Sequence, residues 1–117
     1  MQVPKPTEDD KSRFRSLVPP DPQVEVKPMF GNLGAFVNGN MFMGLFGTDV
    51  GLKLPAAAAE DLLAAGGGPF GPPERPMGGY VSLPAAIPAE QAERLAAEAL
   101  AYIGALPPKK PRTPKRG

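Results

Sequence analysis

Residues 24–54 read VEVKPMFGNLGAFVNGNMFMGLFGTDVGLKL, and this stretch decides the fold. No proline falls between residues 29 and 54, and apolar side chains alternate with small or polar ones, a pattern typical of half-buried strands. Asn38-Gly39 lies between two apolar runs and is a strong hairpin signal, because both residues tolerate positive φ. We therefore expect strands at 24–28, 33–37, 41–46 and 50–54, joined as an antiparallel meander.

The length of the first hairpin loop sets which side chains face one another. A three-residue loop at 38–40 would pair Phe36 with Phe42 and Gly34 with Gly44. A two-residue loop would break both pairs, so we expect the three-residue loop.

The second hairpin is expected to turn at Thr48-Asp49. A two-residue loop there would pair Leu45 with Leu52 and Met43 with Leu54, which gives one consistent apolar face.

The other face of this meander is unusual, because it is rich in glycine, and we call it the glycine face. Glycine weakens a strand and often marks a place where another group approaches the backbone closely. One interpretation is that a helix packs on it with the phenylalanines as core. The other is that it accepts a partner protein. The residues of the face are Gly34, Gly44 and Gly51, interleaved with Phe36, Phe42, Phe46 and Lys53.

Three helices are expected around the sheet. The first begins after Thr7, which suits an N-cap, and ends before Pro19-Pro20. The second covers 56–65 after Pro55, and the third runs from Pro88 to about Leu106 with apolar residues at three- and four-residue spacing. Residues 69–76 are expected to form a loop and Tyr80–Leu83 a further strand.

These elements predict an α+β fold, an antiparallel β-sheet flanked by helices in a single small domain over residues 7–106. The length of 117 residues agrees with one domain. We expect residues 1–6 to be a flexible N-terminus and residues 107–117 a disordered basic tail, because prolines are dense at both ends.

The composition excludes several kinds of chemistry. The chain has no histidine and no cysteine, which removes disulfides, cysteine or histidine zinc sites and Cys–His or Ser–His nucleophiles. The acidic pairs and triplets lie where solvated carboxylates are ordinary. We therefore expect no catalytic residue, no metal site and no cofactor.

The sequence also bears on location. No apolar run approaches the ~20 residues that a membrane span needs, and the N-terminus lacks the apolar core of a secretory signal. We expect a cytoplasmic chain with no membrane contact.

Charge is distributed unevenly along the chain. Residues 1–108 carry a net charge of −4 and residues 109–117 a net charge of +5. One interpretation is a solvated, solubilising terminus. The other is weak, salt-sensitive and sequence-independent binding of nucleic acid through its five cations. These are Lys109, Lys110, Arg112, Lys115 and Arg116.

Five short motifs between residues 24 and 108 resemble the N-terminal domain of the TfoX/Sxy family, in order and in spacing. The motifs are Lys27-Pro28-Met29-Phe30-Gly31, Phe36-Val37-Asn38-Gly39-Asn40-Met41-Phe42, Leu52-Lys53, Pro69-Phe70, and Arg75-Pro76-Met77-Gly78-Gly79-Tyr80-Val81. The motif residues that we single out are Met29, Phe30, Gly31, Asn38, Gly39, Phe42, Lys53, Pro69, Phe70 and Tyr80. The resemblance implies an antiparallel sheet flanked by helices. It also implies a link to regulators of bacterial natural competence, thought to act with the cyclic-AMP receptor protein at promoters.

The function that we expect first is a non-enzymatic protein-interaction module with a regulatory role, which binds a partner protein or a second copy of itself. Its candidate contacts are Phe36, Met43, Phe46 and Lys53. Nucleic-acid binding through the tail is the alternative. A third alternative is a small-molecule site or an enzyme that uses Lys53, Tyr80 or the carboxylates.

Overall fold

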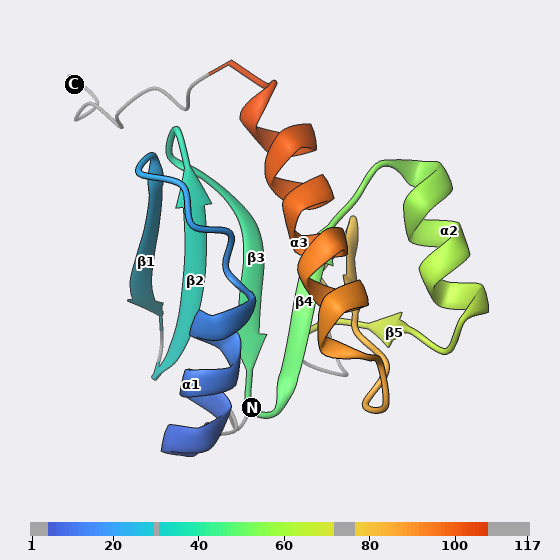
Figure 1. Ribbon diagram of the computed structural model, residues 1–117, viewed down its shortest axis with the longest axis horizontal. Coiled ribbons are helices and arrows are strands. Elements are labelled where there is room, and N and C mark those ends of the chain that lie inside the picture. Colours follow the sequence, from blue (N-terminus) through green and yellow to red (C-terminus); the bar gives the residue numbers. More distant parts are fainter. Residues whose placement is uncertain (1–4, 30, 72–76, 108–117) are drawn as a thin grey trace, which may run out of the picture.

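The computed structural model describes residues 5–29, 31–71 and 77–107, which form three helices and a six-stranded sheet (Figure 1). The helices are α1 (Glu8–Leu17), α2 (Ala56–Ala64) and α3 (Ala89–Gly104). The strands are β1 (Val24–Met29), β2 (Asn32–Val37), β3 (Asn40–Phe46), β4 (Asp49–Lys53), β5 (Gly68–Pro69) and β6 (Tyr80–Ser82). The α+β fold expected from the sequence is confirmed.

The sheet is antiparallel throughout, with the strand order β1-β2-β3-β4-β6-β5. Strands β1 to β4 form the expected meander. The strand β6 then returns beside β4, and the short strand β5 pairs with its outer side. The second residue of β5, Pro69, falls in the stretch 69–76 that we expected to be a loop, and the prediction was wrong at this residue. Residues 72–76 of the stretch lie outside the described residues.

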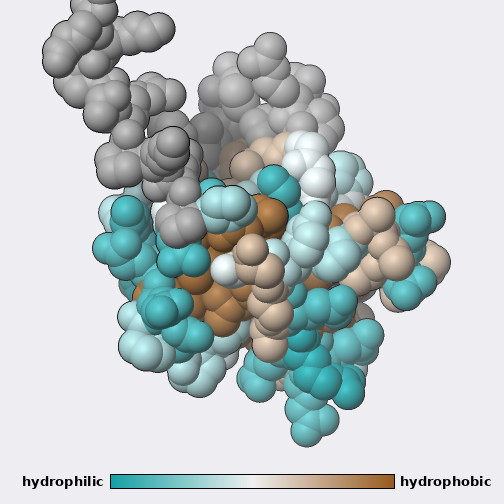
Figure 2. Space-filling model, turned by 90° about the horizontal axis from the view of Figure 1, so that it is seen from above, coloured by the Kyte–Doolittle hydropathy of each residue, from teal (hydrophilic) through white to brown (hydrophobic). Residues whose placement is uncertain are grey.

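Helices α1 and α3 lie on one face of the sheet (Figure 1). The small residues Ala92, Ala96 and Ala99 of α3 are buried, which lets this helix pack closely on the strands. Phe14 and Leu17 of α1 fill the same core. Seen from above, hydrophobic side chains lie at the centre and hydrophilic ones around them (Figure 2).

Local sequence explains how two of the helices begin. Thr7 caps α1 through a capping box, since its Oγ1 accepts from the Asp10 N–H at 3.1 Å and the Asp10 carboxylate accepts from the Thr7 N–H at 2.8 Å. Pro88 is the N-cap residue of α3. The last helix ends at Gly104, so Leu106 lies beyond it and is 43% exposed.

The first hairpin corrects the expected loop length. Its loop is the two residues Asn38 and Gly39, with φ of 53° and 81°, and Val37 pairs with Asn40. The ladder then shifts, because Phe36 pairs with Met41 but Ala35 pairs with Met43. The extra residue is a β-bulge at Phe42.

This bulge has two effects on the predicted pairs. It restores the expected pair of Gly34 with Gly44, while Phe36 faces Met41 and not Phe42. It also turns Phe42 away from the glycine face, so that this side chain is fully buried in the core beneath the helices.

The second hairpin is displaced by two residues from the prediction. Phe46 pairs with Asp49 around a turn at Gly47-Thr48, so Leu45 pairs with Val50 and Met43 with Leu52. Gly47 adopts a φ of 65°, and its N–H donates to the Oδ1 of the buried Asn32 at 2.8 Å. A shift of two residues preserves the faces, so the apolar face forms as expected.

Both edges of the sheet carry a proline. Pro28 has no N–H to offer on the outer edge strand β1, and the N–H of Val24 is donated to the Asp21 carbonyl at 3.0 Å. The opposite edge is the two-residue strand β5, whose second residue is Pro69.

Candidate functional site on the glycine face

Three glycines form a row across the middle of the sheet. Gly34 of β2 pairs with Gly44 of β3, which pairs with Gly51 of β4. All three are buried, although α1 and α3 pack on the opposite face. The interpretation that a helix covers the glycine face is therefore wrong for the part of the chain that the structure describes.

The ring of Phe70 covers one end of this row. A Cβ on Gly51 would overlap the Phe70 ring, and a Cβ on Gly44 would lie 3.3 Å from two of its carbon atoms. Phe70 itself is only 2% exposed. The absence of a side chain at these two positions is therefore what lets the ring lie flat on the backbone.

Two aromatic rings flank Phe70. The ring of Phe46 lies edge-on to it with centroids 6.3 Å apart, and the ring of Tyr80 is tilted against it at 6.0 Å. Both distances fall in the range favoured by aromatic pairs. Residues from β3, β6 and the segment after β5 thus form one aromatic cluster on the glycine face.

The other end of the row is covered by flexible side chains. A Cβ on Gly34 would lie 2.8 Å from the sulfur of Met29 and 3.0 Å from that of Met41. Phe36 completes this group, with its Cε1 at 3.0 Å from the same position. Met29, Met41 and Phe36 are all partly exposed, so this end presents soft, polarisable groups to solvent.

Tyr80 fixes the aromatic cluster to the sheet. Its hydroxyl donates to the Met41 carbonyl at 2.8 Å, next to the bulge. Burial raises the pKa of Tyr80 from 10.0 to about 12. At neutral pH the phenol is therefore a protonated donor that is already engaged, which makes it unsuitable as a catalytic base.

Two cations lie beside aromatic rings of this face. The Nζ of Lys53 is 5.5 Å from the Tyr80 ring centroid, and the Nζ of Lys27 is 5.4 Å from that of Phe36. Lys27 also lies 3.6 Å from the carboxylate of Glu25. These contacts are typical of exposed cation–π pairs, and they place positive charge on both sides of the glycine row.

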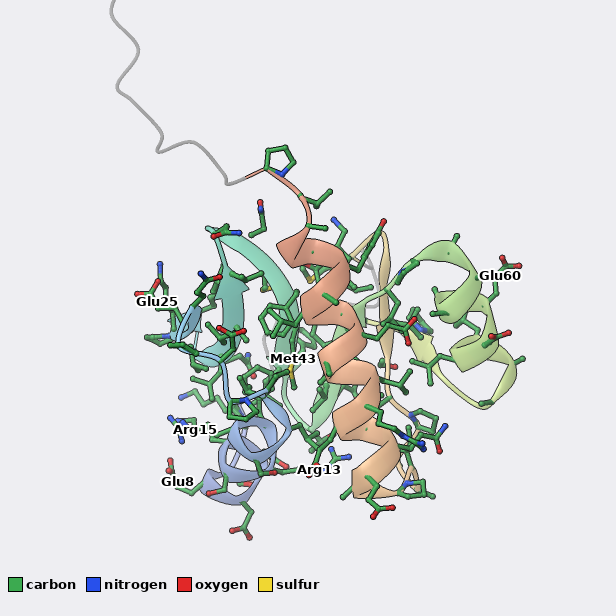
Figure 3. The ribbon with its side chains drawn as sticks, turned by 45° about the horizontal axis from the view of Figure 1, so that its top comes forward. Glu8, Arg13, Arg15, Glu25, Met43 and Glu60 are labelled. Carbon is green, nitrogen blue, oxygen red and sulfur yellow. The ribbon has the colours of Figure 1, made fainter. Side chains whose placement is uncertain are left out.

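The structure brings together some of the predicted contact residues and separates others. Phe36, Phe46 and Lys53 share the glycine face and are partly exposed. Met43 is a correction, because it is fully buried between the sheet and α3 and is unavailable to a partner (Figure 3). Met43 lies on the core side by alternation with Leu45, whereas Phe42 lies there because of the bulge.

The motif residues have structural explanations of several kinds. Gly31 adopts positive φ between β1 and β2, Asn38 and Gly39 do so between β2 and β3, and Pro69 pairs with Val81. Phe70, which we had singled out only from the resemblance, is the centre of the cluster. Phe30 and the five cations of the tail lie outside the described residues.

Among the described residues, no group of three or more acidic side chains is arranged to hold a metal ion. In the same residues, no helix is long and apolar enough to cross a membrane.

Comparison with known proteins agrees with the motifs. No curated protein matches the chain. A comparison with protein families matches residues 2–103 to the TfoX N-terminal domain, which covers most of the 117 residues. The chain therefore belongs to the TfoX N-terminal domain family.

Proposed function

We propose that this protein is a non-enzymatic docking module, like the competence regulators for which its family is named, and that it binds a partner protein through the glycine face. The effect on transcription would then arise through that partner, in the cytoplasm. The membership in the family supports the regulatory role.

One observation carries the proposal. The glycine face is covered by the partly exposed side chains of Met29, Phe36, Met41 and Phe46, whereas the opposite face is buried under α1 and α3. Methionine and aromatic residues are enriched at the centres of protein interfaces, and methionine adapts its shape to a partner. These side chains stand on a rigid sheet, which lowers the entropic cost of binding.

The chemistry of the face favours binding over catalysis. The hydroxyl of Tyr80 is engaged with a backbone carbonyl, and Lys53 is stacked beside the Tyr80 ring. The two lysines flank an apolar surface, an arrangement that suits a partner segment with apolar anchors and nearby carboxylates.

The test is a capture experiment with full-length variants. Phe36→Glu introduces a charge on the glycine face, while Leu63→Glu introduces the same charge on α2 at a side chain that is 48% exposed. The wild type and Leu63→Glu should retain the same protein from an extract of the source cells, and Phe36→Glu should retain at least tenfold less. Thermal melts establish that both variants fold.

Light scattering on the purified chain tests whether the partner is a second copy. Equal capture of the partner by Phe36→Glu and the wild type would contradict the proposal that the glycine face is the docking surface.

A further inference from the structure

A groove lies on a part of the surface that is separate from the glycine face. It lies between α2 and α3, on the side opposite β1 (Figure 1). One hollow of about 320 Å³ is joined to a second of about 210 Å³, and the two share the lining residues Leu62, Ala65 and Gln91. The floor is apolar, with Leu62 in the core and Leu95 partly buried.

The rim of this groove is acidic. Asp61 of α2 and Glu98 of α3 line it from opposite sides. Over the two helices, five carboxylates stand against the single cation Arg94, and Glu60 projects from α2 (Figure 3). An apolar floor with carboxylates on both walls is suited to a basic, extended peptide.

We propose that this groove is the docking site of the chain's own C-terminal segment, residues 108–117. The segment carries five cations and no carboxylate side chain, so its charge is complementary to that of the groove. Prolines at 108, 111 and 114 disfavour a helix and favour an extended conformation, which suits a peptide that lies along a groove.

The exit point of the segment is fixed. The carbonyl of Pro107 accepts from the Asn40 Nδ2 at 3.2 Å, so the described chain ends beside the hairpin between β2 and β3, and the segment must pass over the C-terminal end of α3 to enter the groove. Glu98 precedes Gly104 by six residues, about 9 Å along the helix, and Gln91 precedes it by thirteen residues, about 20 Å. Ten extended residues span up to about 33 Å, which exceeds both of these lengths along the helix.

Tethering also raises the local concentration of the segment. Attachment to the same chain through a short flexible linker gives an effective concentration in the millimolar range, so contacts too weak to join two separate molecules suffice within one chain. This favours the chain's own segment over that of a second copy.

Zero-length crosslinking of the full-length protein tests the proposal. A carbodiimide joins a lysine amine to a carboxylate only where the two are in contact, and mass spectrometry of the monomer identifies the pair. We expect Lys109, Lys110 or Lys115 to be joined to Asp61 or Glu98, with at least a tenfold lower yield in 1 M NaCl.

Two full-length variants complete the test. Asp61→Asn with Glu98→Gln should remove these crosslinks, while Glu8→Gln with Asp9→Asn, both on α1, should leave them unchanged. All four side chains are exposed, so both variants should keep the fold, as circular dichroism can verify.

Three results would overturn the proposal. If no crosslink joins the segment to Asp61 or Glu98, the segment does not dock in the groove. Equal crosslink yields on Glu8 and Asp9 show that the segment contacts carboxylates without selectivity. Crosslinks confined to the dimer assign the groove to the segment of a second copy.

Discussion

At the scale of single residues, the three glycines of the row differ in what a side chain would meet. At Gly51 a methyl group would overlap the Phe70 ring, whereas at Gly34 it would meet the flexible ends of methionines. Rigid neighbours resist displacement more than flexible ones do. An added methyl group should therefore destabilise the protein more at Gly51, beside the Phe70 ring, than at Gly34, beside the methionines.

Gly51→Ala should destabilise the protein by about 1–3 kcal/mol, the usual cost of overpacking. Urea denaturation measures the free energy of unfolding. Gly78→Ala is the matched control, because nothing lies within 4 Å of its added methyl group, and it should change stability by less than about 0.5 kcal/mol. If Gly51→Ala destabilised the Phe70→Ala variant by as much as it destabilises the wild type, the Phe70 ring would not be the cause of the lost stability.

Tyr80 makes stability depend on pH in the alkaline range. Its pKa is raised from 10.0 to about 12 in the folded protein, so the unfolded chain loses this proton first. The stabilising contribution is complete below pH 10 and is lost as the pH rises through 12. Tyr80→Phe should flatten this part of the curve of unfolding free energy against pH.

The same substitution should lower stability at pH 7 by about 1 kcal/mol, because the Met41 carbonyl loses its donor. Tyr102→Phe, at a side chain that is 40% exposed, is the control. An identical alkaline profile for Tyr80→Phe and the wild type would show that Tyr80 is not the titrating group.

At the scale of elements, the first hairpin combines a two-residue turn with a bulge. The turn needs positive φ at Asn38 and Gly39, which only glycine and asparagine adopt cheaply. The bulge then decides that Phe42 and Met43 both enter the core. The turn and the bulge together set the composition of both faces of the sheet.

Asn38→Val should destabilise the protein by about 1–2 kcal/mol, because a β-branched residue is strained at a φ of 53°. Asn38→Gly should be nearly neutral in the same thermal or urea unfolding measurement. Equal losses of stability for the two variants would show that the cause is the removal of the side-chain amide and not backbone strain at positive φ.

Local signals in the sequence were sufficient to predict most of the elements. The capping residue Thr7, the prolines before α2 and α3 and the Asn-Gly turn each act within a few residues. Registers depend on more distant contacts. A bulge has no strong sequence signal, so Phe42 was wrongly expected on the glycine face. Met43 was expected on the apolar face beside Leu45, and its full burial there contradicts the partner contact that was also expected of it.

The candidate site was only partly predictable for the same reason. The glycines, Phe36 and Phe46 follow from alternation along one strand at a time. The position of Phe70 depends on how β5, β6 and β4 align, which joins segments far apart in the chain. Only the family resemblance had singled out this residue.

At the scale of the whole molecule, the two faces of the sheet have separate tasks. The face under α1 and α3 forms the core, and the glycine face presents soft apolar groups between two lysines. The basic segment after Pro107 is a third part, and its sequence suits both the α2–α3 groove and a polyanion.

Binding of a short DNA duplex tests the second of these partners. If three to five cations neutralise phosphates, the affinity should fall roughly 40- to 500-fold between 50 and 200 mM salt. A full-length variant with all five cations replaced by glutamine should lose this binding in fluorescence anisotropy. Unchanged binding by that variant would exclude the segment as the DNA contact.

The prolines at both borders of the sheet bear on whether the protein aggregates edge to edge at high concentration. Strand addition needs a free row of donors, and neither Pro28 on β1 nor Pro69 on β5 supplies one. Each proline interrupts the row of donors at its edge, so the addition of further strands is disfavoured at both borders of a sheet whose glycine face carries partly exposed methionine and phenylalanine side chains.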